Sequence, residues 1–191
     1  MNIGIFSGSF NPIHHGHLMI ANYIAEFTTL DEIWFLVSPQ NPLKKKTELA
    51  DAHHRLQMVR NALSDFDRLK ASDFELHLPL PSYTIDTLKA LQKAYPEHTF
   101  SLVIGADNWT LFQEWKDYQE ILRNYRIYVY KRLNYSILIP GQYQSRVVVP
   151  EAPVLEISST FIRESISRGK DVRAFIPGEN WKYIEENGLY R

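Results

Sequence analysis

The run Gly8-Ser9-Phe10-Asn11-Pro12-Ile13-His14-His15-Gly16-His17 holds residue types that can act on a phosphate group. Gly8 allows a close backbone approach that any Cβ would obstruct, and Gly16 leaves open space beside two imidazoles. His14 and His17 lie three residues apart, so they would share one face of a helix that begins near them. At the positive end of that helix, both imidazoles could donate hydrogen bonds to phosphate oxygens and stabilise charge that develops at a phosphorus.

Two other interpretations of this histidine pair are open. Either imidazole could be an ordinary structural histidine, and histidines at helical spacing can also bind zinc. The sequence offers no third ligand nearby, and it lacks the glutamate of a His-Glu-x-x-His motif. The Gly-Lys-Ser/Thr of a P-loop and the Gly-x-Gly-x-x-Gly fingerprint are absent from this segment as well. We therefore favour a phosphate site in which the side chains bind no metal.

Two later segments could contribute to the same site. One is Gly105-Ala106-Asp107, which ends an apolar run, and the other is Ile157-Ser158-Ser159-Thr160-Phe161-Ile162-Arg163. A helix start rich in Ser and Thr offers hydroxyls and free backbone amides to an anion, and Arg163 one turn later adds a permanently charged donor fork. Taken alone, a Ser-Ser-Thr run is more often a helix cap than an anion site.

Alternating strands and helices would position these segments. The hydrophobic pattern predicts strands over residues 2–6, 31–37, 69–76, 100–104 and 127–130, with short strands over 146–149 and 154–157. It predicts helices over residues 14–25, 52–63, 85–91, 108–125, 159–167 and 179–187. This order favours an α/β fold with a Rossmann-like, open, mostly parallel sheet and helices on both faces. In such a sheet, ligands bind beyond the carboxyl ends of the strands, where all three segments fall.

Length and composition limit the classes of protein. The chain has 191 residues, which fits one domain over 1–191, and its 45% hydrophobic and 23% charged content is that of an ordinary globular protein. A net charge of -1 gives no overall attraction to a nucleic acid polymer or to a membrane, so phosphate recognition must be local. The absence of cysteine excludes thiolate nucleophiles and cysteine zinc sites. Without a basic leader or a long apolar run, we expect a cytoplasmic location.

The motifs match those of a known group of enzymes. The first segment resembles the Gly-x-Phe-x-Pro-x-His-x-Gly-His motif of the HIGH-type nucleotidyltransferase superfamily, and residues 157–163 are similar to its Ile-Ser-Ser-Thr-x-Ile-Arg motif. Within it, the chain resembles bacterial nicotinate mononucleotide adenylyltransferases over nearly its whole length, on residues 81–88, 105–109, Trp115 and 188–191. Pantetheine-phosphate adenylyltransferases share the first and last motifs, but they are usually shorter and lack the Ser-Tyr-Thr stretch and the Trp-bearing segment.

The resemblance implies an activity and its site residues. The adenylyl group of ATP would be transferred to nicotinate mononucleotide, with release of pyrophosphate, in NAD synthesis. The residues implied on the ATP side are Gly8, Ser9, Phe10, His14, Gly16, His17, Gly105, Asp107, Ser158, Ser159, Thr160 and Arg163, with Asp107 at a ribose. On the acceptor side, Trp115 would stack on the pyridine ring and Thr84 would help bind its carboxylate through the backbone. Without the resemblance, a core or surface tryptophan and a helix cap explain these two residues.

One stretch departs from the family pattern. Residues 38–46 stand where the family usually has Pro-Pro-His-Lys. Lys45 is the predicted phosphate-binding lysine, Lys44 is a near-equal alternative, and the lysine run could also be a solvated loop. His54 begins the following helix, and we assign it no role. The predicted catalytic residues are thus His14, His17, Lys45 and Arg163.

The expected reaction needs charge stabilisation more than a strong base, because a phosphate monoester is already an anion at pH 7. Mg²⁺ would arrive with ATP and be held by phosphates and water. The partners would be ATP and a pyridine mononucleotide, and the oligomeric state is left open, a homo-oligomer included. Two alternatives remain: an adenylyltransferase for nicotinamide mononucleotide or phosphopantetheine, and a nucleotide sensor without catalysis.

Overall fold

A single parallel sheet organises the computed structural model, which describes residues 1–39 and 49–191. Within these residues the strand order is β3-β2-β1-β4-β5-β6, and every neighbouring pair is parallel. The strands are β1 (Asn2–Gly8), β2 (Glu32–Val37), β3 (Leu69–Ser72), β4 (Thr99–Gly105), β5 (Arg126–Tyr130) and β6 (Val147–Val148). The predicted Rossmann-like α/β fold is confirmed. The strand order reverses between β1 and β4, which is where a doubly wound sheet opens a crevice for ligands.

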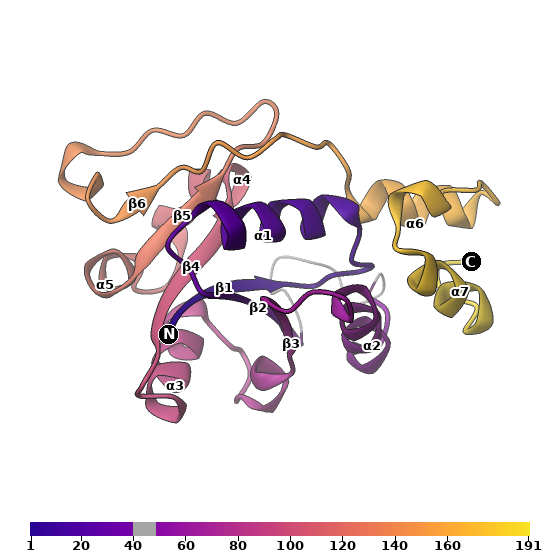
Figure 1. Cartoon of the computed structure of the whole chain (residues 1–191), viewed down its shortest axis with the longest axis horizontal. Coiled ribbons are helices and arrows are strands. Elements are labelled where there is room, and N and C mark those ends of the chain that lie inside the picture. The colour runs from indigo at the N-terminus through magenta and orange to yellow at the C-terminus, as the bar shows by residue number, and fades with distance from the viewer. Residues whose placement is uncertain (40–48) are drawn as a thin grey trace.

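Helices cover both faces of the sheet. They are α1 (His15–Phe27), α2 (Ala52–Leu63), α3 (Thr84–Ala94), α4 (Ala106–Thr110), α5 (Tyr118–Asn124), α6 (Ser159–Ser167) and α7 (Gly178–Glu186). Short 3-10 turns are η2 (Phe74–His77), η3 (Phe112–Glu114), η4 (Gly141–Tyr143) and η5 (Arg173–Phe175). Helices α6 and α7 lie beyond the carboxyl end of β1, on the side away from the N-terminus (Figure 1).

The strands have continuous apolar sequences because both faces of the sheet are buried. In β5, Ile127 and Val129 point into a core shared with α3 and α5, whereas Tyr128 and Tyr130 point into a core shared with α1, α2, α6 and α7. Successive side chains of a strand point to opposite faces, so one short strand contributes to both cores. The helices around the sheet are thereby held on the two faces that position the site.

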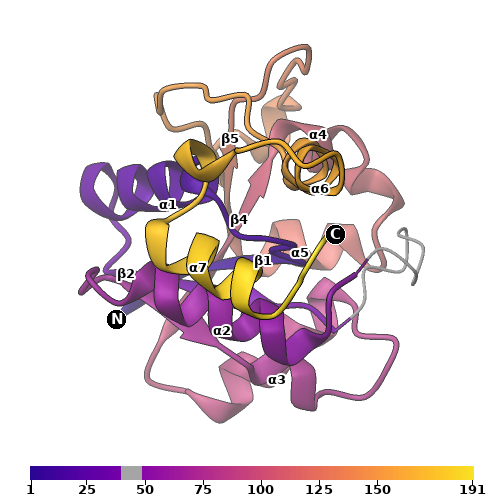
Figure 2. The same cartoon turned by 90° about the vertical axis from the view of Figure 1, so that its right-hand side faces the viewer.

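The C-terminal segment returns to the carboxyl end of β1. The Asn180 side chain, which is fully buried, donates a hydrogen bond to the Met58 carbonyl at 2.9 Å and so joins α7 to α2. Figure 2 shows α7 lying across α2 with the C-terminus beside α6. Helix α7 ends before Gly188, whose φ of 59° is a left-handed conformation that glycine adopts without strain, as the sequence predicts.

Three element predictions were wrong in their extent. The strand predicted over residues 69–76 ends at Ser72, and η2 replaces its second half. The helix predicted over 108–125 is three separate pieces, α4, η3 and α5, with Asp117 in a left-handed conformation at φ 51° before the last. Residues 154–157 form no strand. In the first two cases apolar residues pack against the core from short turns, which a periodicity argument cannot distinguish from longer elements. In the third, Val154 and Leu155 are exposed, so their apolar side chains do not indicate a buried strand.

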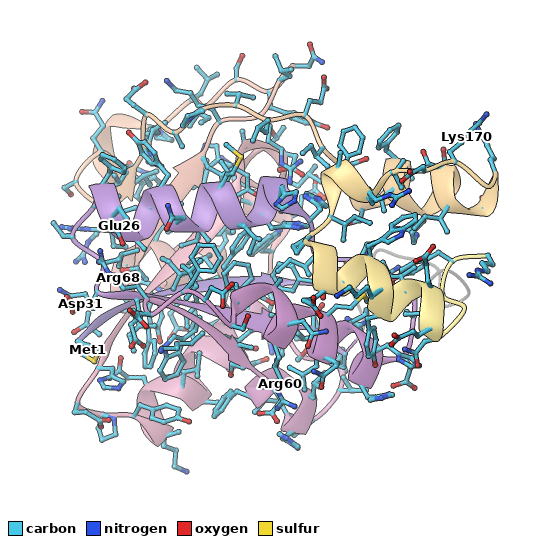
Figure 3. All side chains as sticks on the ribbon, turned by 45° about the vertical axis from the view of Figure 1, so that its right-hand side comes forward. Met1, Glu26, Asp31, Arg60, Arg68 and Lys170 are labelled. Atoms are coloured by element: carbon cyan, nitrogen blue, oxygen red, sulfur yellow. The ribbon has the colours of Figure 1, made fainter. Side chains whose placement is uncertain are left out.

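A cluster of charged side chains marks the opposite end of the sheet. Arg68 forms an ion pair with Glu26 at 3.2 Å, and its Nε donates to the Asp31 carbonyl at 2.8 Å. Figure 3 shows these three residues together near Met1, far from Lys170, which follows α6.

In the described part of the chain, no helix has the length and apolar character to cross a membrane.

Candidate active site

The loop between β1 and α1 folds back on aromatic rings. Phe10 is 2% exposed, with its ring packed edge-on against Phe6 and His17 at centroid distances of 5.6 and 5.2 Å. A Cβ on Gly8 would lie 3.0 Å from the Phe10 ring. A side chain at position 8 would therefore press on the Phe10 ring, which is itself buried in the core. The Phe10 φ of 43° belongs to the left-handed region, which few non-glycine residues adopt.

The two predicted histidines lie together at the start of α1. Their rings stack with centroids 3.7 Å apart and planes inclined by 25°. His14 is the N-cap residue, and its backbone N–H donates to Nδ1 of His17 at 3.3 Å. Since Nδ1 accepts this bond, the proton of a neutral His17 ring is on Nε2, which can then donate to a phosphate oxygen.

His14 is an almost fully buried imidazole. It is 3% exposed, and burial, with smaller contributions from the charges of Arg132 and His15, lowers its pKa from 6.5 to about 3. A Cβ on Gly16 would lie 3.0 Å from Nδ1 of His14, so the glycine makes the room that the sequence suggested. At neutral pH the His14 ring is therefore uncharged.

The start of α6 is bonded to this loop. Ser159 Oγ donates to the Pro12 carbonyl at 2.9 Å, and Arg163 Nη1 donates to the Asn11 carbonyl at 2.9 Å. Ser158 is the N-cap of α6, and its Oγ accepts from the Phe161 amide at 3.1 Å. Thr160, in the first turn, is exposed. The first and third predicted segments thus form one contiguous surface, although the bonded pair Pro12 and Ser159 is 147 residues apart in sequence.

The second predicted segment meets an arginine that the sequence analysis did not select. Asp107 Oδ1 lies 3.1 Å from Nε of Arg132, and Arg132 Nη2 donates to the Tyr130 hydroxyl at 3.2 Å. A Cβ on Gly105 would lie 2.9 Å from Arg132 Nε and would collide with Asp107, which explains the glycine. A small cavity joins Arg132 to the histidines; it is lined by His14, Gly16, His17, Tyr130, Arg132 and Ile157, among others. Arg132 could have been selected from the sequence, because it lies just after the carboxyl end of β5, where ligands bind in such a sheet.

The predicted acceptor residues come together on another part of the surface. Thr84 is the first residue of α3, and its first turn carries Asp86, which binds Lys116 Nζ at 2.8 Å. Lys116 Nζ also lies 4.7 Å from the centre of the Tyr83 ring. These contacts bring the residue after Trp115 against the start of α3. Trp115 itself is half-buried, so part of its indole stays available to a ligand.

A second arginine missed by the sequence analysis fixes the loops around the site. Arg55 is 1% exposed, and it donates to the carbonyls of Ser9 and Ser38 at 2.8 Å and of Ala50 at 2.9 Å. Burial lowers the pKa of its guanidinium. Arg55 thereby joins the loops that follow β1 and β2. The neighbouring His54, to which the sequence gave no role, lies with Nδ1 2.9 Å from the Tyr183 hydroxyl and links α2 to α7.

Asn11 connects the site to the chain end. Its Oδ1 accepts from the Tyr190 hydroxyl at 2.8 Å and from the Ala50 amide at 3.1 Å.

The predicted phosphate-binding lysine, Lys45, and its alternative Lys44 lie outside the described residues. Among residues 1–39 and 49–191, no group of three or more His, Asp or Glu side chains is arranged to hold a metal ion.

This fold and this pair of joined motifs define a class of protein. The model of the cytidylyltransferase-like family matches residues 5–165, from β1 into α6, so the chain belongs to that family. The resemblance of the sequence to the HIGH-type nucleotidyltransferases is thereby confirmed.

Relatives point to one activity within the family. A protein of Flavobacterium johnsoniae is 47% identical over the full length of both chains, and one of Bacteroides fragilis is 49% identical over 95% of this chain and 90% of its own. Both are named probable nicotinate-nucleotide adenylyltransferase. A solved structure of the Plasmodium falciparum nicotinic acid mononucleotide adenylyltransferase, complexed with NaAD, has a TM-score of 0.81 at 22% identity over 99% of this chain and 97% of that chain. At that identity it supports the fold.

Proposed function

We propose that this protein transfers the adenylyl group of ATP to nicotinate mononucleotide, giving the dinucleotide and pyrophosphate, as a step of NAD synthesis. The observation that carries the proposal is the junction of the two motifs, where Arg163 and Ser159 bond to the loop that leads to His17. The relatives' shared name supports the choice of substrate. A Plasmodium falciparum structure titled as a complex with NaAD, which has the same fold, supports the choice of product.

The reaction would be an in-line displacement at the α-phosphorus of ATP. An oxygen of the mononucleotide phosphate forms the new bond, the bond from the α-phosphorus to the bridging oxygen of the β-phosphate breaks, and its electron pair leaves with pyrophosphate. The attacking phosphate is already ionised at pH 7, so the site has to align two anions and stabilise the charge that develops between them. Neutral imidazole donors, guanidinium groups and helix amides suit that task.

We assign each group a role in this reaction. His17, through Nε2, would donate to the α-phosphate, and Arg163 with the first turn of α6 would hold the outgoing phosphates. Asp107 would accept from a ribose hydroxyl, with Arg132 fixing its orientation. Trp115 and the amides around Thr84 would take the pyridine ring and its carboxylate.

Mg²⁺ would enter as part of the ATP complex, where it shields the triphosphate charge. The donors gathered around His17 and Arg163 are imidazole, guanidinium and amide groups, which bind phosphate oxygens and not a hard cation. Phosphates and water would therefore supply the metal ligands, and no protein side chain is assigned to it. A cytoplasmic location stays a prediction, and the oligomeric state stays open.

Pyrophosphate release from ATP, with one acceptor offered at a time, tests the proposal. We expect release with nicotinate mononucleotide, less with nicotinamide mononucleotide, and none with phosphopantetheine. Release with phosphopantetheine alone would move the protein to another acceptor class. Tight ATP binding with no release for any acceptor would identify a nucleotide sensor and contradict the proposal.

A further inference from the structure

Glu75 is a buried carboxylate that bridges two parts of the molecule. It lies in η2 and is 6% exposed. Oε2 accepts from Ser7 Oγ at 2.7 Å, and Oε1 accepts from Ser82 Oγ at 3.0 Å. Within the described residues, no cation lies within ion-pair distance of either oxygen.

The two serines belong to the two sides of the proposed site. Ser7 lies at the end of β1, directly before Gly8 and the loop to His14. Ser82 lies two residues before Thr84, where α3 begins. Each oxygen of the Glu75 carboxylate accepts a hydrogen bond from one of these serines. The carboxylate therefore links the ATP side of the proposed site to the acceptor side.

Burial of this charge has an energetic cost that an apolar side chain would avoid. A carboxylate taken out of water without a cation is less stable than one in water, and here burial raises the pKa of Glu75 while the two hydroxyl donors lower it. A residue that served only to fill the core would not need two acceptor oxygens. The geometry, with each oxygen bonded to a different segment, instead suits a rigid link between those segments.

Only one of the two segments depends on the bridge. Ser7 pairs with Leu36 in the sheet, so β1 keeps its place without Glu75. Residues 79–82 have no regular secondary structure, and among the described residues their one hydrogen bond is that of Ser82 with Glu75. Loss of the bridge would therefore release the segment that leads into the first turn of α3, while burial of Ile85 holds the rest of the helix and the sheet holds the end of β1.

We infer that Glu75 is a positioning residue of the acceptor site, which holds the helix start at Ser82 and Thr84 at a fixed place relative to the end of β1. The inference rests on the proposed function, in which the amides of that helix start bind the nicotinate carboxylate. Glu75 touches neither substrate. It sets where the acceptor group lies in relation to the α-phosphorus of ATP.

Steady-state kinetics of the full-length chain test the inference. Glu75→Ala and Ser82→Ala should each raise the KM for nicotinate mononucleotide about tenfold, because misplaced binding groups lose most of their benefit. The KM for ATP should stay within about twofold. Glu75→Gln keeps one acceptor oxygen, so its KM for the acceptor should fall between those of the wild type and Glu75→Ala. The double variant Glu75→Ala/Ser82→Ala should be no worse than either single variant, since both remove the same link.

Two controls separate positioning from general destabilisation. Leu76→Ala removes a partly buried apolar side chain from the same turn, and it should lower the melting temperature without changing the KM for the acceptor. Glu26→Gln makes the same carboxylate-to-amide change at the far end of the sheet, beside Arg68 (Figure 3), and should change neither KM.

An unchanged acceptor KM in folded Glu75→Ala would overturn the inference, and so would an equal rise in both KM values. If the wild-type protein forms no dinucleotide from nicotinate mononucleotide, the proposed function itself fails and the inference fails with it. The wild-type measurement therefore distinguishes the two failures.

Discussion

The imidazoles of His14 and His17 stack with their centroids 3.7 Å apart, while the backbone N–H of His14 donates to Nδ1 of His17. Two imidazolium rings at this distance would repel each other, and burial holds His14 neutral by lowering its pKa. The pair is therefore asymmetric. In the proposed site His14 would support and orient the pair, and His17, which is less buried, would donate to the ligand through its second nitrogen.

His17→Ala should lower kcat about a hundredfold, because it removes a donor that matters most in the transition state. His17 is only partly buried at the start of a surface helix, so the fold should persist. His15→Ala makes the same change two residues earlier and should retain most of the activity. Pyrophosphate release and circular dichroism of both variants are the measurements, and near-normal turnover of folded His17→Ala would contradict the role given to it.

The buried imidazole of His14 should make stability depend on pH. Its folded-state pKa of about 3 lies below the unfolded value of 6.5, so between these values the unfolded chain binds more protons. The free energy of unfolding must then fall as the pH drops through that window, by about 2 kcal/mol from pH 7 to pH 5 for this group. Urea unfolding of the wild type and of His14→Gln at both pH values isolates the effect. The free energy of unfolding of the wild type, minus that of His14→Gln, should be smaller at pH 5 than at pH 7. A difference that does not change with pH would refute the prediction.

Arg163→Lys should raise the KM for ATP about tenfold and change the KM for the acceptor less. A guanidinium can donate to the Asn11 carbonyl and still bind a phosphate with a second pair of donors. A lysine ammonium cannot do both. Arg68→Lys is the matched control, since the same change is made in the cluster beside Glu26 at the other end of the sheet (Figure 3). Equal ATP kinetics for the two variants would reduce the third motif to a helix cap.

Arg132→Gln should raise the pKa of His14, because the guanidinium charge is the second cause, after burial, of its low value. Burial remains, so the pKa should stay below the ordinary value of 6.5. The same variant frees Asp107 from its ion pair and should raise the KM for ATP. NMR titration of the histidine ring protons checks the first effect, and an unchanged His14 titration would show that Arg132 does not influence the ring.

The sequence predicted the fold and the joined motifs because their signals are local. Apolar runs such as residues 100–104 indicate buried strands. Parallel strands bring the loops after their carboxyl ends to one edge of the sheet. His17 and Arg163 could therefore be brought to one site without knowledge of any contact. The broken helix over 108–125 shows the limit of this reasoning, since Asp117 interrupts it with a conformation that no periodicity encodes.

The supporting charges could not be predicted, because their partners are far away in sequence. Glu75 lies in a stretch that was predicted as a strand, and its hydroxyl partner Ser7 is 68 residues away. Arg55 lies beside His54 at the start of the helix after β2, where the sequence assigned it no role, although it is 1% exposed and bonded to backbone carbonyls. Only the folded arrangement shows that such a charge is satisfied internally.

The preference for the acid over the amide should depend on the amides around Thr84 and not on Trp115. Both mononucleotides carry the same flat ring, so stacking on Trp115 adds affinity without discrimination. The start of α3 presents free backbone amides and a positive dipole end, which favour a carboxylate and offer no acceptor to a carboxamide NH₂.

Trp115→Ala should accordingly raise the KM for both acceptors, spare the KM for ATP, and leave the ratio of the two kcat/KM values nearly unchanged. Trp181→Ala, which truncates a half-buried indole on α7, should change neither acceptor KM. Glu75→Ala should behave differently from Trp115→Ala, because displacement of the helix start weakens the carboxylate contact alone and so lowers the preference for the acid. Steady-state kinetics of the three variants with each mononucleotide measure these ratios. An equal or higher kcat/KM for the amide in the wild-type protein would refute the acid assignment even if adenylyl transfer itself were observed.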